Sequence, residues 1–153
     1  MTNEYIKPPV EIRYKNELDA LKSVDIGKKP ENWVLSPKAV RTFILGGIIK
    51  TADGKMQIKR KFYGNDALVE RCIITLAGNR GLMLVGEPGT AKTMLSELLS
   101  AACCGISTNT VQGTAGTTED MIKYSWNYAM LLSNIRITLL GCVVNNEKQI
   151  LED

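Results

Sequence analysis

Hydrophobic positions in the middle of the chain recur with the period of amphipathic helices. One helix is predicted to begin at Ser36-Pro37 and to end at Gly46-Gly47, because serine caps free backbone N–H groups and proline is tolerated at the first helical position. A second is predicted from the capping pair Asn65-Asp66 to Gly78. A third, over residues 92–102, places its leucines on one side.

A β-hairpin is predicted around Ala52-Asp53-Gly54. Short runs that contain apolar residues, Ile48 to Thr51 and Lys55 to Ile58, flank this turn, and Asp-Gly is a strong hairpin signal. The basic continuation Lys59-Arg60-Lys61 is interpreted as a solvated face, because short runs of charge usually are.

Further apolar runs predict the strands of a parallel sheet. Residues 82–85 are wholly apolar, as expected for a strand buried on both faces. Residues 106–111 and 137–144 are candidates for a second and a third strand. Strands that alternate with helices in this order predict an α/β fold in which helices flank a parallel sheet.

One more helix is predicted between the last two of these strands. Its start is a Thr117-x-x-Asp120 capping box. The residues that follow at helical spacing and are expected to be buried are Ile122, Trp126, Ala129 and Met130.

Composition excludes some classes of function without selecting one. A chain of 153 residues can build one domain with a core, and its net charge of +3 gives no specific signal for nucleic acid. No apolar run is long enough to span a membrane, and the first ten residues do not form a secretory signal, so a cytoplasmic protein is expected. A zinc site is not expected, because there is no histidine and no C-x-x-C pair.

The chemistry of the chain is predicted by the stretch Gly86-Glu87-Pro88-Gly89-Thr90-Ala91-Lys92-Thr93, which lies between an apolar run and a helix. That is the context of a phosphate-binding loop. Backbone N–H groups of such a loop, with the positive end of the following helix dipole, form a nest for an anion. Lys92 is expected to contact the β- and γ-phosphates of ATP, and the Thr93 hydroxyl to bind Mg²⁺.

Ala91 departs from the usual pattern G-x-x-x-x-G-K-[ST], in which glycine precedes the lysine. If the backbone there needs a positive φ, alanine is strained by roughly 1–2 kcal/mol. If the backbone is already helical, alanine fits and stiffens the loop. We favour the helical alternative, because Lys92 continues a helical pattern.

This loop resembles the Walker A loop of MoxR-type and dynein-related AAA+ ATPases, a group in which alanine often precedes the lysine. Residues 113–122 also resemble a sequence of that group, and the similarity runs from about Ser36 to Leu132. It implies a P-loop NTPase fold that binds ATP or ADP with Mg²⁺, with adenine near Tyr63 to Asp66. It further implies ATP hydrolysis coupled to remodelling of a client protein or complex, and a homo-oligomeric ring in the full-length family. We therefore expect residues 1–35 to be a loosely packed N-terminal extension and residues 36–153 to form a partial AAA+ domain.

A Walker B strand, in which Asp-Glu follows apolar residues, is absent from the sequence. Residues 137–144 are followed instead by Asn145-Asn146-Glu147, and asparagine is a poorer Mg²⁺ ligand than a carboxylate. Glu147 is a candidate for the catalytic glutamate, although a solvated loop residue is the better interpretation. The chain is expected to be the front half of a module, whose lid and sensor residues would lie downstream. The resemblance implies an ATP hydrolase, whereas these residues predict binding without appreciable turnover.

Other interpretations of the loop remain open. The chain could be a non-enzymatic module that binds nucleotide or another subunit without hydrolysis, and the absence of Walker B favours this for the chain alone. A GTPase should carry an Asn-Lys-x-Asp guanine reader, which does not occur here. A small kinase should have an arginine-rich lid, but Arg136 is the single arginine after Arg80.

Overall fold

The computed structural model describes residues 7–52, 54–111, 113, 116, 118, 124–126 and 137–139. The chain divides into two compact units, residues 1–108 and residues 109–153. The first unit contains the helices, a β-hairpin and the candidate phosphate loop. Helices and small sheets are mixed, and the sheets of the described residues are two-stranded and antiparallel.

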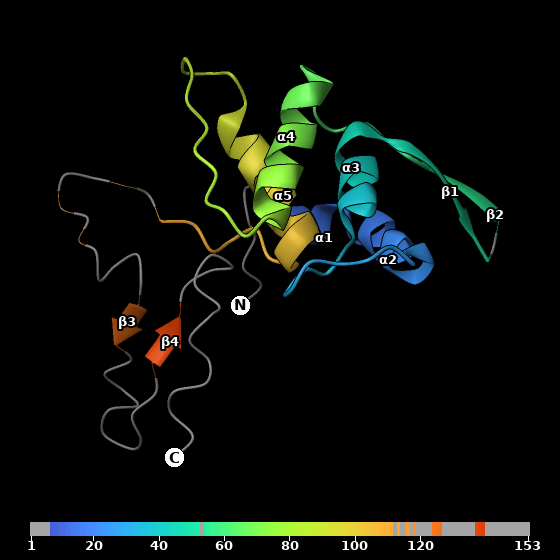
Figure 1. Ribbon diagram of the computed structural model, residues 1–153, viewed down its shortest axis with the longest axis horizontal. Helices are drawn as coiled ribbons and strands as arrows, with labels where there is room; N and C mark the ends of the chain where they lie inside the picture. Colours follow the sequence, from blue (N-terminus) through green and yellow to red (C-terminus); the bar gives the residue numbers. More distant parts are fainter. Residues whose placement is uncertain are drawn as a thin grey trace. The chain divides into compact units, whose positions relative to one another are not determined.

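Among the residues that the structure describes, the first unit contains five helices (Figure 1). They are α1 (Val10–Arg13), α2 (Lys15–Val24), α3 (Pro37–Leu45), α4 (Asp66–Ala77) and α5 (Lys92–Cys104). The three helices predicted from hydrophobic spacing in this region, α3, α4 and α5, are confirmed, and α5 runs two residues beyond Ala102.

The helix starts follow the capping residues of the sequence. The Ser36 hydroxyl accepts a hydrogen bond from the Ala39 amide at 3.3 Å, and the Asn65 side chain accepts one from the Ala67 amide at 3.0 Å. Ser36 in turn donates its hydroxyl proton to Asp25 at 2.6 Å, which fixes the loop before α3. Burial acts to raise the pKa of Asp25, but hydrogen bonds from Ser36 and Gly27 and the charge of Lys29 lower it below its ordinary value.

The predicted hairpin is also confirmed. Strands β1 (Gly47–Thr51) and β2 (Gly54–Ile58) pair antiparallel, with Ile49 opposite Met56 and Lys50 opposite Lys55. Residues that lie directly opposite share one face of the ribbon. Ile49 and Met56 pack against the core, whereas Lys50 and Lys55 are exposed.

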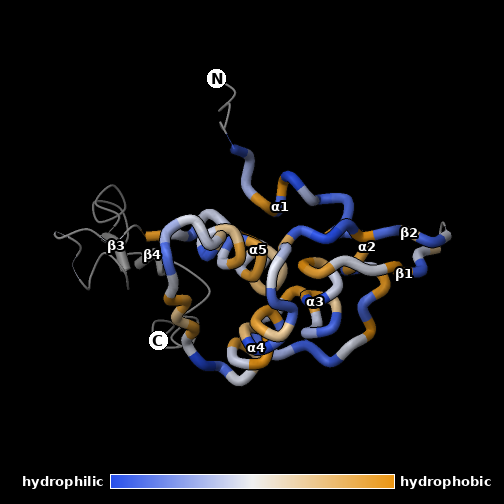
Figure 2. The backbone as a smooth tube through the Cα atoms, turned by 90° about the horizontal axis from the view of Figure 1, so that it is seen from above, coloured by the Kyte–Doolittle hydropathy of each residue, from blue (hydrophilic) through white to orange (hydrophobic). Residues whose placement is uncertain are grey.

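The core lies where α3, α4 and α5 meet the N-terminal helices. Figure 2 shows hydrophobic stretches gathered in α3, α4 and α5. The largest fully buried side chains are Phe43, Leu21, Leu35, Ile44, Ile58, Leu95 and Leu98. Burial raises the pKa of the Cys103 thiol on α5 to about 12, which is typical of a thiol in an apolar core.

The described part of the N-terminal extension is tightly packed, so our expectation of loose packing is wrong. Leu18 and Leu21 of α2 are 3% and 2% exposed. Glu11 of α1 accepts hydrogen bonds from the hydroxyl of Ser107 at 2.6 Å and from its amide at 3.1 Å. Lys7 also pairs with Glu97 of α5 at 2.8 Å. These polar contacts, together with the two buried leucines, hold the segment against the rest of the first unit.

In the basic run after β2, Lys59 is exposed as expected, but Arg60 is partly buried and Lys61 is buried. The Lys61 side chain is 2% exposed and forms an ion pair with Glu17 of α2. Its ammonium donates to the carbonyls of Phe43 and Lys59 at 2.9 and 3.0 Å, and lies 4.3 Å from the centre of the Phe43 ring. Arg60 is also engaged, with the Asp66 carboxylate. These lysine and arginine side chains therefore join elements of the core instead of facing solvent.

The predicted parallel sheet does not occur among the described residues. Residues 82–85 are extended but form no strand; Leu82 and Leu84 pack against the core, while Met83 and Val85 are 85% and 81% exposed. This segment therefore has one partly buried side, which packs against the core, and one exposed side. Residues 106–111 also form no strand, and Ile106 and Val111 are 47% and 46% exposed.

The described part of the second unit is a small sheet of β3 (Tyr124–Trp126) and β4 (Ile137–Leu139), paired antiparallel. The strand expected from Ile137 is confirmed over three residues. The helix expected around Trp126 is wrong there, because residues 124–126 are extended and hydrogen-bonded to β4. Thr117, Asp120 and the other positions of that helix, together with Asn145, Asn146 and Glu147, lie outside the described residues.

Candidate functional site

The candidate site is the loop that connects residues 82–85 to α5. The loop residues are exposed from Gly86 to Ala91, and Lys92 is partly buried as the first residue of α5. Gly89 has φ +83°, and Ala91 has φ 58° and ψ 23°, so both adopt left-handed backbone conformations. Two left-handed residues turn the chain sharply into the helix, which is how the extended segment meets the start of α5.

Lys92 folds back over this loop. Its ammonium donates to the carbonyl of Gly86 at 2.9 Å, to the carbonyl of Glu87, and to the hydroxyl of Thr90 at 3.0 Å. The Thr90 hydroxyl donates in turn to the Glu87 carbonyl at 2.8 Å. The loop therefore surrounds the charge that the sequence predicts to contact phosphate.

The start of α5 is open to an anion. No side chain caps this helix, and its first turn contains no acidic residue. Free N–H groups and the positive end of the helix dipole favour negative charge at such a position. Thr93 lies exposed in this first turn, beside Lys92 in sequence, where a hydroxyl ligand for Mg²⁺ was predicted.

Both glycines of the loop have open surroundings. A Cβ atom built on Gly86 would lie 3.5 Å from the Thr90 hydroxyl and 4.0 Å from the Lys92 ammonium, which is ordinary van der Waals contact. Nothing lies within 4 Å of the Cβ position of Gly89. No group of three or more His, Cys, Asp or Glu side chains that could hold a metal occurs among the described residues. Phosphate binding by the loop, with the Thr93 hydroxyl as a ligand of a phosphate-bound Mg²⁺, stays a prediction.

The conformation of Ala91 corrects the favoured sequence interpretation. Ala91 is left-handed and precedes the helix, with its carbonyl accepting the first helical hydrogen bond from the Leu95 amide at 3.0 Å. The helical pattern that begins at Lys92 does not extend back to this residue, because the turn from the extended segment needs a positive φ. The cost of roughly 1–2 kcal/mol therefore applies to this alanine.

Ala91→Gly and Ala91→Val should change the affinity for nucleotide differently. Glycine adopts a positive φ freely, so the Gly variant should bind nucleotide at least as well as the wild type. A β-branched residue is a true outlier there, so Ala91→Val should weaken nucleotide binding roughly tenfold or more by distorting the loop. Titration of a fluorescent ATP analogue into both variants measures this. Equal affinities for the two variants would contradict the left-handed assignment.

Adenine was expected near Tyr63 to Asp66, and both of these residues contact Arg60. Tyr63 is 79% exposed, and the Arg60 guanidinium lies 5.7 Å from the centre of its ring. Arg60 also donates to the carbonyl of Phe62 at 2.8 Å and pairs with Asp66. An exposed aromatic ring is thus present at this position, and its use by adenine stays a prediction.

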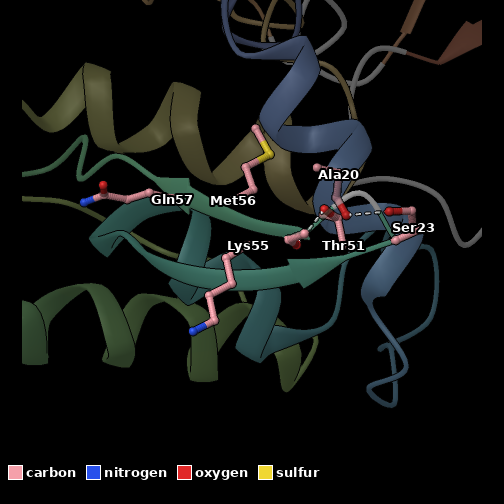
Figure 3. A pocket seen from close by; sticks show the side chains of 8 residues that line it. Ala20, Ser23, Thr51, Lys55, Met56 and Gln57 are labelled. Atoms are coloured by element: carbon pink, nitrogen blue, oxygen red, sulfur yellow. Dashed lines mark hydrogen bonds between the residues drawn. The ribbon is translucent and has the colours of Figure 1, made fainter.

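A separate cleft of about 690 Å³ lies between α2 and the hairpin (Figure 3). Ser23 and Thr51 line it, but their hydroxyls donate to the carbonyls of Ala20 and Gly54 at 2.8 and 3.0 Å. None of its lining residues belongs to the loop at Gly86 to Thr93. The two hydroxyls of this cleft are therefore already paired with backbone carbonyls.

Comparison with known proteins supports the class of protein that the loop defines. Residues 81–147 match the family model of the AAA domain, dynein-related subfamily. That match covers the loop and α5, and it supports a nucleotide-binding module of the AAA+ ATPase type.

A particular relative is the Uncharacterized protein YehL of Escherichia coli (strain K12). The chain is 49% identical to it over 132 residues, which are 86% of this chain. The aligned part spans 35% of the length of that protein. No solved structure matches the chain. Across the described residues, no helix has the length and apolar character needed to cross a membrane.

The structure brings four of the eight predicted loop residues together through hydrogen bonds and adds a contact that the sequence did not indicate. Gly86, Glu87, Thr90 and Lys92 converge through hydrogen bonds, while Pro88 and Gly89 form the exposed turn between them. The contact between Thr90 and Lys92 was missed, because this position of the motif accepts any residue and carries no signal in a single sequence.

Proposed function

We propose that this chain is the ATP-binding part of a MoxR-like, dynein-related AAA+ ATPase. ATP or ADP would lie with its phosphates over residues 86–93, against Lys92 and the first turn of α5. Thr93 would contribute a hydroxyl to Mg²⁺. The observation that carries the proposal is the convergence of Lys92 and the glycine-rich loop at an uncapped helix start.

The proposal extends to the larger protein of which such a module is part. In that setting, ATP hydrolysis would drive remodelling of a client protein or complex, subunits would assemble as a homo-oligomeric ring, and the protein would act in the cytoplasm. The support is the AAA domain match and the sequence resemblance.

Nucleotide titration tests the proposed binding. A fluorescent ATP analogue with Mg²⁺ should bind the chain, and unlabelled ATP should displace it far better than GTP, because the sequence contains no guanine-reading motif. Displacement by GTP as effective as by ATP would count against an adenine site. Absence of any binding would refute the proposed function.

A second candidate is a module that binds nucleotide without hydrolysis. The observation that favours it for this chain is the absence of Asp-Glu after an apolar run anywhere in the 153 residues. Phosphoryl transfer needs a water held in line with the γ-phosphate, and the glutamate that would position it is the missing part.

We expect the purified chain to release phosphate from ATP slower than about one turnover per minute, because a loop that binds phosphate without positioning water supplies little of the catalysis. Phosphate release is followed over hours, with Lys92→Ala as the control for contaminating ATPases. A faster rate that disappears in Lys92→Ala would mean that Glu147 or another residue completes a working site.

A further inference from the structure

The ammonium group of Lys92 is saturated by its own loop. An ammonium has three hydrogen-bond donors. Lys92 places them on the Gly86 carbonyl, the Glu87 carbonyl and the Thr90 hydroxyl. A phosphate oxygen that approaches Lys92 must therefore replace at least one of these acceptors.

Thr90 differs from the other two acceptors because it acts through its side chain. Its hydroxyl accepts from Lys92 at 3.0 Å and donates to the Glu87 carbonyl at 2.8 Å, so it closes a ring with the carbonyl that Lys92 also contacts. The two carbonyls belong to the backbone and are present in any sequence. Thr90 is the acceptor that a single substitution can remove.

We infer that Thr90 is a positioning residue that holds Lys92 against the loop and competes for its ammonium with the phosphates of the nucleotide. The inference rests on the proposed function, since it concerns the same loop. A charged phosphate oxygen is a stronger acceptor for an ammonium than a neutral hydroxyl, so the exchange favours nucleotide once it is present. The Thr90 contact nevertheless lowers the affinity, because it must be broken.

Thr90→Val tests this with a side chain of similar shape that lacks the hydroxyl. One N–H of Lys92 then has no partner in the loop, and nucleotide should bind about threefold to tenfold more tightly than to the wild type. Thr90→Ser keeps the hydroxyl and should bind like the wild type. A purely structural role of Thr90 in the turn predicts the opposite, because loss of its bond to Glu87 would loosen the loop and weaken binding.

The contact can also be measured without nucleotide. The protein is treated briefly with an amine-acylating reagent, and the labelling of Lys92 is quantified by mass spectrometry of its peptide. Lys55, which is exposed on the hairpin, serves as the internal reference. Lys92 should be labelled several-fold faster in Thr90→Val than in the wild type or Thr90→Ser, with the rate at Lys55 unchanged.

The outcomes separate this inference from the proposed function. Faster labelling of Lys92 together with tighter binding of a fluorescent ATP analogue in Thr90→Val, and wild-type behaviour in Thr90→Ser, support it. Unchanged labelling, or equal or weaker binding in Thr90→Val while the wild type binds nucleotide, overturns it. No nucleotide binding in any variant refutes the proposed function and, with it, the competition with phosphate. Circular dichroism melts of each variant confirm that the compared proteins are folded.

Discussion

Lys92→Ala should weaken ATP binding by roughly tenfold or more, because hydrogen bonds to a charged group contribute about 1.5–3 kcal/mol each. The substitution removes the charge expected to contact the β- and γ-phosphates, while Gly86, Gly89 and the helix start remain. Affinity is measured by titration of a fluorescent ATP analogue in the presence of Mg²⁺.

The matched control for Lys92→Ala is Lys55→Ala, which removes the same charge from the exposed face of the hairpin. It should leave the affinity within about twofold of the wild type, since exposed charges far from a site are screened by salt. Equal affinity of Lys92→Ala and wild type would contradict the assignment of the phosphate site. Equal losses in both variants would indicate a general electrostatic effect.

Glu17→Ala should destabilise the protein by about 3 kcal/mol, because it leaves a buried cation without its counter-ion. The Lys61 side chain is 2% exposed, and Glu17 at 17% is its ion-pair partner. The two carbonyl contacts and the aromatic rings of Phe43 and Tyr14 remain around the ammonium but carry no full negative charge. The free energy of unfolding is measured by urea titration.

Two further variants separate the buried pair from a general effect of charge removal. Asp19→Ala breaks the exposed pair with Lys22 on the same helix and should cost about 0.5 kcal/mol or less. Lys61→Met combined with Glu17→Ala should recover at least about 1 kcal/mol relative to the sum of the single changes, since neither charge is then stranded. Additive losses would show that Glu17 and Lys61 contribute independently.

The same pair predicts a dependence on pH. Burial lowers the pKa of Lys61 below its ordinary value of 10.5, and the attraction of Glu17 does not fully offset it. Between this lowered pKa and 10.5 the unfolded chain binds more protons than the folded one at this site, so the contribution of Lys61 to stability rises with pH. The free energy of unfolding of the wild type relative to Lys61→Met should therefore increase through this window. Taking the difference between the two proteins removes the opposite contribution of the buried Cys103 thiol, whose pKa is raised to about 12.

Polar contacts of the N-terminal segment support the helix that follows the phosphate loop. Lys7 forms an ion pair with Glu97 in the middle of α5, and Glu11 accepts a hydrogen bond from Ser107, which follows the C-terminal end of this helix. The loop therefore leads into α5, which is held by polar contacts with the N-terminal segment and by packing with α3 and α4 in the buried core. Such support is what holds the start of a helix in place when a ligand binds to it.

The sequence by itself determined the features that depend on neighbouring residues. Helix α3 begins after Ser36 and ends before Gly46, and α4 begins after Asn65 and ends before Gly78. The Asp-Gly turn places the hairpin. These features are predictable because capping and turn chemistry act over a few residues. The phosphate loop was also recognisable, since its glycines, lysine and threonine are contiguous. The roles of its residues toward nucleotide stay predictions.

Only the tertiary structure decided the features that depend on distant partners. A short charge run does not reveal that Glu17 and the ring of Phe43 will enclose Lys61, and an apolar run at residues 82–85 does not reveal that helices will cover one of its sides. Extended pairing of residues 124–126 with β4 likewise overrode a helical spacing of apolar residues. In each case the local pattern indicates which apolar or charged side chains need a partner. The covering group comes from elsewhere in the chain, and so its identity is set by packing.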